Sequence, residues 1–129
     1  MLKSNQRGST VLEAVLTCIV IGILIGIAVP YYHRLALEAK KVTLRAGLVN
    51  IRGGIGLYHA LEQHYPTDLK SLVHRKYLLP VSNEIISGEY LMAQSVDGEG
   101  NLLDPFGNRY RYDSATGRVT SNTKGYENW

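Results

Sequence analysis

The first part of the chain is strongly apolar, and the rest alternates apolar with polar residues. From Ser9 to Val29 there are 21 residues without Lys, Arg or Asp, and Glu13 is the one acidic residue among them. A helix of that length rises about 30 Å, which matches the hydrocarbon core of a bilayer. The pattern predicts a membrane-spanning helix rather than a helix buried in a soluble core.

Beyond Pro30, apolar and small residues recur at alternating spacings of four and three, which is the period of one helix face. They predict a single helix from about Thr10 to His64 whose second half lies on a soluble domain. Glycines cost about 1 kcal/mol each relative to Ala in a helix, so we expect local fraying around residues 53–56. The positions of this stripe are Leu35, Ala39, Val42, Ala46, Val49, Gly53, Gly56 and Ala60.

A short second helix is expected directly after the long one. Pro66 breaks the long helix, because proline lacks the backbone N–H that a helix interior needs. Thr67 then serves as the N-cap of a helix from Asp68 to about Lys76, which Pro80 closes.

The remainder predicts short strands joined by turns. The strands are expected in GEYLMAQSV, NRYRYD and RVTSNT, with turns at DGEGN and SATG. In NRYRYD, Tyr110 and Tyr112 alternate with arginines, so one face is aromatic and the other charged. This alternation predicts a half-buried antiparallel strand lying over the long helix.

Charge and cysteine content add little to this picture. The formal net charge is +3, and Lys3 and Arg7 are the charged residues before position 9. Without them, twelve Lys and Arg face eleven Asp and Glu, so a nucleic-acid partner is not expected. The chain has one cysteine, Cys18, so an internal disulfide is excluded. The basic residues after the apolar segment predict a solvated helix face, with contact to phospholipid headgroups, acidic partner subunits or nucleic acid as the alternative. They are Arg34, Lys40, Lys41, Arg45 and Arg52.

The N-terminus is compatible with several interpretations. A secretory signal peptide would place a small-residue cleavage site at residues 26–28, but Glu13 and Pro30 fit that scheme poorly. An uncleaved anchor would be oriented by its flanking Lys and Arg, and the four that follow the segment outnumber the two before it. That count alone would leave the C-terminal part in the cytoplasm.

A third interpretation accounts for more of the residues. A basic leader, Met1 to Gly8, ends in glycine; Glu13 follows that glycine by five residues and Pro30 by twenty-two. This N-terminus resembles that of type IV pilins and type II secretion pseudopilins. YPTDLKSLV, LDPFGNRYRY and the final NW also resemble the soluble part of the major type II secretion pseudopilin. The acidic calcium-binding loop of that family, between its last strand and the terminus, is missing here.

The resemblance implies specific processing. A prepilin peptidase would cut after Gly8 on the cytoplasmic side, and the new amine of Ser9 would be methylated. The family usually has Phe at this first mature position, so the Ser is a departure that bears on methylation. The resemblance also directs the C-terminal part away from the cytoplasm, against the count of flanking charges.

Cleavage would give Glu13 a partner. A carboxylate within a bilayer is costly unless it is paired. The α-amino group of Ser9, whose ordinary pKa is about 7.7 to 8, would be cationic and one helical turn away. Within one chain this geometry is possible, and between neighbouring chains the pair would set the axial register of an assembly. The resemblance implies the second. The alternative is that Glu13 offsets the helix dipole or lies at headgroup level.

Gly22, Gly26 and Pro30 are further candidates. The two glycines form G-x-x-x-G, which lets two helices approach closely. Beside Pro30 they also make this stretch easier to unwind. In the resembling filaments that unwinding accompanies assembly.

Enzymatic and metal-binding patterns are weak. His59 and His64 are five residues apart, so on a helix they point in different directions rather than to one metal. Asp97, Glu99 and Asp104 lack the ligand count of an EF-hand, so we expect turn and surface residues. We expect no enzyme, no cofactor and no metal.

Together these observations predict a pilin-like α+β protein. Its parts would be a leader (1–8), a transmembrane half of the helix (9–29), a soluble half (30–65) and an α+β head (66–129). The expected function is a structural filament subunit, first a secretion pseudopilin and second an adhesion, motility or DNA-uptake pilin. Its partners would be copies of itself, related minor subunits, prepilin peptidase, inner-membrane assembly machinery and lipid. A single-pass, membrane-anchored binding module that never assembles is the competing class.

Overall fold

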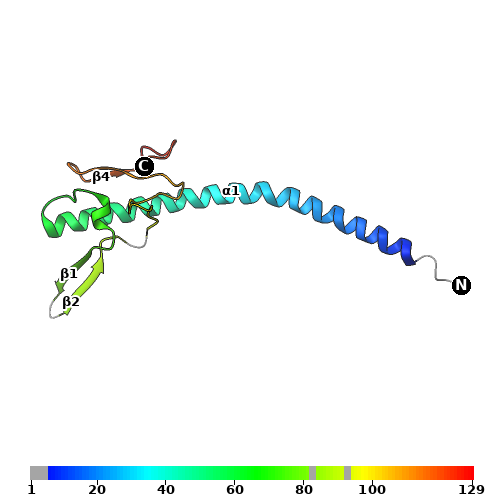
Figure 1. Cartoon of the computed structure of the whole chain (residues 1–129), viewed down its shortest axis with the longest axis horizontal. Coiled ribbons are helices and arrows are strands. Elements are labelled where there is room, and N and C mark those ends of the chain that lie inside the picture. The colour runs from blue at the N-terminus through cyan, green and yellow to red at the C-terminus, as the bar shows by residue number, and fades with distance from the viewer. Residues whose placement is uncertain (1–5, 82–83, 92–93) are drawn as a thin grey trace. The chain divides into compact units, whose positions relative to one another are not determined.

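The computed structural model describes residues 6–81, 84–91 and 94–129 (Figure 1). The chain divides into two compact units, residues 1–39 and 40–129. The first unit is helical throughout its described part, and the second, which we call the head, combines the end of the same helix with short strands. The elements are α1 (Gln6–Glu62), the 3-10 helix η1 (Leu69–Leu72), β1 (Lys76–Val81), β2 (Glu84–Glu89), β3 (Arg111–Asp113) and β4 (Arg118–Thr120).

The expected long helix is present, and its bounds differ from the prediction by a few residues. α1 begins at Gln6, before the expected start at Thr10, and ends at Glu62. Gln63 follows with a φ of 61°, and its backbone N–H donates to the His59 carbonyl at 2.9 Å. This left-handed residue terminates the helix as a C-terminal cap does. The fraying expected around residues 53–56 is absent. That stretch is helical, and its Gly54 and Ile55 are buried against the rest of the head.

The predicted contact face of α1 was wrong. In the head, the small-residue stripe is solvent-exposed, and Val42 and Val49 are each 68% exposed. The face that packs starts at Leu44, two residues on from Val42, which is about 200° around a helix. Burying a Leu or Ile is worth about 1.5–3 kcal/mol, so the stripe of larger side chains is the one buried. Its apolar members are Leu44, Leu48, Ile51, Ile55 and Tyr58.

The core of the head forms where this face meets the loops and β4. Val119 on β4 is fully buried, as is Leu72 at the end of η1. The segment between β2 and β3 contributes further buried residues, and η1 contributes Leu69. These additional core residues are Leu69, Tyr90, Leu91 and Leu102.

Two of the helix glycines allow close approach to the helix. A Cβ at Gly54 would lie 2.4 Å from the Tyr90 carbonyl oxygen, and one at Gly47 would lie 2.8 Å from the Tyr110 hydroxyl. Gly53 and Gly56 have nothing within 4 Å of a Cβ. The first pair is therefore required by packing, while the second pair faces open space.

The short helix predicted from Asp68 to Lys76 is a single 3-10 turn, η1. Its N-cap is Asp68 rather than Thr67, and the Asp68 side chain accepts a hydrogen bond from the Lys70 backbone N–H at 3.3 Å. Lys76, the expected end of the helix, begins β1 instead. A strand was missed here because Pro80 was taken as a helix terminator, although proline is tolerated at the edge of a two-stranded sheet.

Two antiparallel hairpins make up the strands of the described residues. β1 pairs with β2, with Lys76 opposite Glu89 and Val81 opposite Glu84. The strand expected in GEYLMAQSV was largely wrong, because β2 begins at Glu84 and includes only Gly88 and Glu89 of that stretch. Met92 and Ala93 lie outside the described residues. β3 pairs with β4, and the turn expected at SATG joins them.

The alternation in NRYRYD is confirmed, although β3 itself is only three residues long. Tyr110 and Tyr112 are half-buried, while Arg109 and Arg111 are exposed. The Tyr112 hydroxyl donates to the Pro66 carbonyl at 2.6 Å, which ties β3 to the segment after the helix. The α+β, pilin-like architecture predicted from the sequence is thus confirmed.

The close approach at Gly54 predicts opposite effects for two neighbouring substitutions. Gly54→Ala should lower the free energy of unfolding by about 1–3 kcal/mol, because the Cβ overlaps the Tyr90 carbonyl and the Leu91 side chain. Gly53→Ala should raise it by about 0.5–1 kcal/mol, because Ala favours the helix and meets no neighbour. Thermal unfolding of the full chain in detergent, followed by tyrosine near-UV circular dichroism, measures both. Equal effects of the two variants would contradict this account of the packing.

Candidate assembly site

The residues predicted for processing and register lie together at the start of α1. Gly8, Ser9 and Glu13 are all within the helix and all exposed. Ser9 and Glu13 are four residues apart, so they lie one above the other on one helix face. The Glu13 backbone carbonyl accepts a hydrogen bond from the Thr17 hydroxyl at 2.8 Å, and Glu13 itself is exposed.

The residues predicted for helix packing lie further along the same unit. Gly22 and Gly26 have nothing within 4 Å of a Cβ, so within one chain both present bare backbone to the surroundings. Pro30 lies inside α1, with helical residues on both sides. The stretch is therefore helical in the single chain, and its two glycines are available to a neighbouring helix.

The surface of this unit is unusual for a protein in water. Among the described residues, α1 is the one helix long and apolar enough to cross a membrane, and none of its most apolar window is buried. Large apolar side chains line it all around; Leu12 is 71% and Ile27 is 67% exposed. An apolar surface of this extent needs lipid or other apolar helices around it. Cys18 is exposed on the same helix.

The histidines of the head pack against tyrosines rather than forming a metal centre. The His59 ring stacks on Tyr65 with centroids 4.3 Å apart, and His64 meets the edge of Tyr58 at 5.5 Å. Within the part of the chain that the structure describes, no group of three His, Cys, Asp or Glu side chains is arranged to hold a metal.

Some of the basic residues that follow the apolar segment hold the C-terminal segment instead of forming a purely solvated face. The Lys40 ammonium lies 5.7 Å from the Phe106 ring centroid, and the Arg45 guanidinium lies 4.5 Å from that of Trp129. Arg52 donates to the Val119 carbonyl on β4 at 3.1 Å. These contacts are cation–π pairs and a hydrogen bond, so they fasten the end of the chain to α1.

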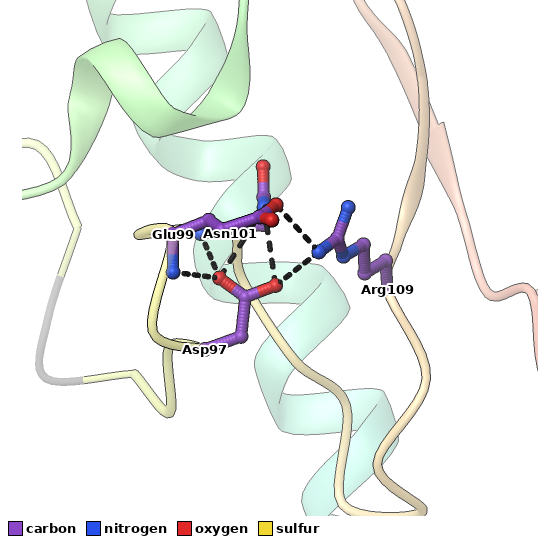
Figure 2. A network of polar contacts seen from close by, with 4 residues as sticks. All are labelled: Asp97, Glu99, Asn101 and Arg109. Carbon is purple, nitrogen blue, oxygen red and sulfur yellow. Dashed lines mark hydrogen bonds and ion pairs between the residues drawn. The ribbon is translucent and has the colours of Figure 1, made fainter.

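The turn expected at DGEGN contains a charged network (Figure 2). The Asp97 carboxylate accepts hydrogen bonds from the backbone N–H groups of Glu99 and Asn101, at 2.9 and 2.8 Å. Arg109 pairs with Asp97 at 2.6 Å and with Glu99 at 2.9 Å. The Asn101 backbone N–H, assisted by the Arg109 guanidinium, lowers the pKa of Asp97 to about 2. These hydrogen bonds and ion pairs join the two ends of the turn to Arg109.

Asp104 forms a second polar cluster, and it is buried rather than on the surface as expected. Only 3% of the residue is exposed. One carboxylate oxygen accepts from the backbone N–H groups of Phe106 and Asn108, both at 2.9 Å. The other accepts from the Thr123 hydroxyl, which in turn accepts from the Asn108 side-chain amide at 2.8 Å. Asp104 therefore links the LDPFGN turn to the segment after β4.

The acidic residues present do not fit the calcium ion of the resembling family. Calcium takes six to eight oxygen ligands. Here the carboxylates of Asp97 and Asp104 already accept N–H and O–H donors, and Arg109 supplies a positive charge beside Asp97 and Glu99. In the segment after β4 the sole acidic side chain is Glu127, which accepts from the Gly125 backbone N–H at 2.8 Å. Protein donors occupy the acceptors that a cation needs.

Sequence reasoning missed the roles of Arg109 and Thr123. Arg109 was assigned to the charged face of a strand; it is exposed, but it precedes β3 and forms an isolated bridge with Leu103. Its two acidic partners lie ten and twelve residues earlier. Thr123 lies nineteen residues after Asp104. The DPFGN turn was the available signal, because an Asp that accepts from N–H groups two and four residues later marks a turn with a buried carboxylate.

Comparison with known proteins gives the chain its family. No protein-family model and no solved structure matches it. The type II secretion system core protein G of Escherichia coli (strain K12) is 30% identical over 115 residues, which cover 84% of this chain and 79% of that protein. The chain belongs to the pilin and pseudopilin family.

Membership of this family explains the contrast between the two units. A pseudopilin-like protein is a structural subunit, and the exposed apolar helix fits an inner-membrane anchor. The pilin-like head carries the polar clusters described above, and its relative is a structural protein rather than an enzyme.

The Asp104 cluster predicts a head whose stability depends on a threonine hydroxyl and not on calcium. Thr123→Val should lower the free energy of unfolding by about 1–3 kcal/mol, because it leaves the buried Asp104 oxygen and the Asn108 amide unpaired. Thr123→Ser keeps the hydroxyl and should lose much less. The midpoint of thermal unfolding of the wild-type chain should be the same in excess calcium and in chelator. A calcium-dependent rise of several degrees would refute the assignment.

Proposed function

We propose that this chain is a filament subunit that prepilin peptidase cuts after Gly8 and that assembly machinery draws from the inner membrane into a helical polymer. The proposal is supported by one observation above all: the exposed apolar helix carries a lone carboxylate, Glu13, one turn from the residue that cleavage would make the N-terminus. A spanning helix has no use for that charge unless a cation meets it.

The cation in this proposal is the amine of Ser9. Within one chain it lies four residues from Glu13 on the same face, so an intrachain pair is geometrically open to it. In an assembly the amine of one copy meets Glu13 of the next, and the pair sets the axial register. We assign Glu13 this register role and Ser9 the site of methylation.

Gly22, Gly26 and Pro30 have a separate role in the same proposal. The two glycines bare the backbone on a helix that has no neighbour within its own unit, so they offer a surface for close helix packing. Pro30 removes one backbone hydrogen bond nearby, which lowers the cost of local unwinding as the helix enters the polymer.

We infer that the head faces the periplasm before assembly and the filament surface afterwards. The family relation supports this orientation, whereas the count of flanking basic residues points the other way. Two of those basic residues, Lys40 and Arg45, lie over aromatic rings of the head. Packing of the head is therefore a second reason for their presence, besides membrane orientation.

Within the family, secretion is the first assignment. The relative is named as a core protein of a type II secretion system, and the similarity covers most of both chains. A pilin for adhesion, motility or DNA uptake is the second candidate, because the same kind of N-terminal helix is expected in a pilin and in a secretion pseudopilin. A membrane-anchored binding module that does not assemble is the third, and the Glu13 pair argues against it.

The first prediction of this proposal concerns the mature N-terminus. Intact mass measured from cells that contain prepilin peptidase should correspond to a chain starting at Ser9, with or without one methyl group. Cells without the peptidase should yield the full chain. Gly8→Val should block cleavage, whereas Gly22→Val should not, although both glycines are in open space on α1. A Met1 start in both strains, or a start near Val29, would sink the proposal.

The second concerns assembly. Glu13→Ala should leave cleavage intact and reduce filament yield by at least about tenfold, because loss of a pair in an apolar environment costs several kcal/mol and 1.4 kcal/mol is tenfold. Thr17→Val, one turn along, removes only a hydrogen bond within the helix and is the matched control. Sheared filaments, collected by centrifugation and quantified, provide the measurement. Undiminished yield from Glu13→Ala would remove the register role.

A further inference from the structure

The β1–β2 hairpin is attached to the head at its base and unpartnered elsewhere. At the base, the Tyr90 backbone N–H donates to the Arg75 carbonyl at 3.1 Å, and the rings of Tyr77 and Tyr90 lie 5.3 Å apart. Beyond the base, Figure 1 shows the hairpin projecting from α1. Its apolar side chains are correspondingly exposed.

The two faces of the hairpin differ in chemistry. Residues directly opposite each other share a face, so the register places Leu78, Pro80 and Ile85 on one side. The other side carries Val81 and Ile86, 49% and 48% exposed, together with the Glu84 carboxylate opposite Val81. This second side, which we call the Glu84 face, is an apolar patch with one negative charge.

A pocket of complementary chemistry lies where the C-terminus meets α1. It has a volume of about 260 Å³ and is lined by Arg45, Leu48, Val49, Arg52 and Trp129. We call it the Trp129 pocket. Val49 is 68% exposed at its floor, and Trp129 is half-buried beneath the Arg45 guanidinium. Aromatic rings and arginines around an exposed apolar floor are the composition typical of protein-binding hot spots.

The charge of this pocket selects its occupant. Arg45 rests on an aromatic ring and Arg52 donates to a backbone carbonyl, and both line the pocket. The side chains that line it are therefore apolar or positively charged. The complementary partner has an apolar surface that carries a carboxylate, which is the composition of the Glu84 face.

The hairpin and the pocket lie on different sides of the head. Figure 1 shows β1 and β2 on one side of α1, with β4 and the C-terminus on the other. The Glu84 face of a chain therefore meets the pocket of another chain rather than its own. A contact that joins two different surfaces of identical copies repeats from copy to copy, and it forms a ring or an open helical polymer.

We propose that the Glu84 face of one copy docks in the Trp129 pocket of a second copy. Val81 and Ile86 cover Val49 and Trp129, and Glu84 lies between the two arginines. The inference rests on the proposed function, because it names the contact by which heads follow one another in the filament. It is independent of Glu13, which acts in the other unit.

Cysteine cross-linking between two differently tagged copies of the full chain tests this contact in cell membranes and filaments. All variants carry Cys18→Ser, which removes the native thiol. Val81→Cys in one copy and Val49→Cys in the other should give a disulfide-linked dimer of the two tags. Either variant expressed alone should give none. Ile85→Cys, on the opposite face and 73% exposed, is the matched control and should not cross-link to Val49→Cys.

The charge is tested in the same assay. Glu84→Arg should reduce the Val81–Val49 cross-link by about tenfold or more, because it sets a third positive charge against two arginines. Glu89→Arg, at the base of the hairpin and on the other face, should leave it unchanged. Both positions are exposed, so neither change threatens folding.

The outcomes separate this proposal from the filament itself. Filaments without the cross-link overturn the docking contact and leave the proposed function standing. A cross-link of Val81→Cys to itself would mean that hairpins pair with each other, which also overturns it. A cross-link without filaments supports the docking contact and refutes the proposed filament function. If neither the cross-link nor filaments form, both proposals are refuted.

Discussion

Burial of one face of α1, from Leu44 to Tyr58, is the interaction on which the head depends. Four short strands and one 3-10 turn cannot form a core alone, since two-stranded sheets are marginal in water. The helix supplies the continuous apolar surface that they lack. Several other segments contribute buried side chains to it, such as Leu72 after the helix and Val119 on β4.

Polar contacts then fasten the parts of the head that bury little. A cation–π contact between Arg45 on α1 and Trp129 holds the C-terminal segment against the helix. A hydrogen bond from the Thr123 hydroxyl to Asp104 joins the same segment to the preceding turn. A carboxylate so deeply buried is tolerated because it accepts three hydrogen bonds, two from backbone and one from a hydroxyl. The same work can be done by a bound cation, and here side chains and backbone do it.

The first unit follows the opposite rule. Its apolar side chains have nothing to pack against within their own unit, so their stability must come from lipid or from other helices. Family membership fits this division, since a pseudopilin-like structural subunit combines a helix suited to an inner-membrane anchor with a folded head. In the proposed function Glu13 has a place in this unit, because a carboxylate acceptable at a membrane edge would set the axial register once an amine faces it.

The sequence by itself determined the length and apolar character of α1, the alternation of Tyr110 and Tyr112 with arginines, and the turns at DGEGN and SATG. These are local patterns, because a helix period, a strand period or a turn residue predicts the structure of its own segment. The tertiary structure decided which stripe of α1 is buried, since two stripes share the helical period and only packing compares their sizes. It also decided that Asp104 is buried and that KYLLPV is a strand. Those outcomes depend on partners such as Thr123 and Glu89, which lie far along the chain and leave no mark on the local pattern.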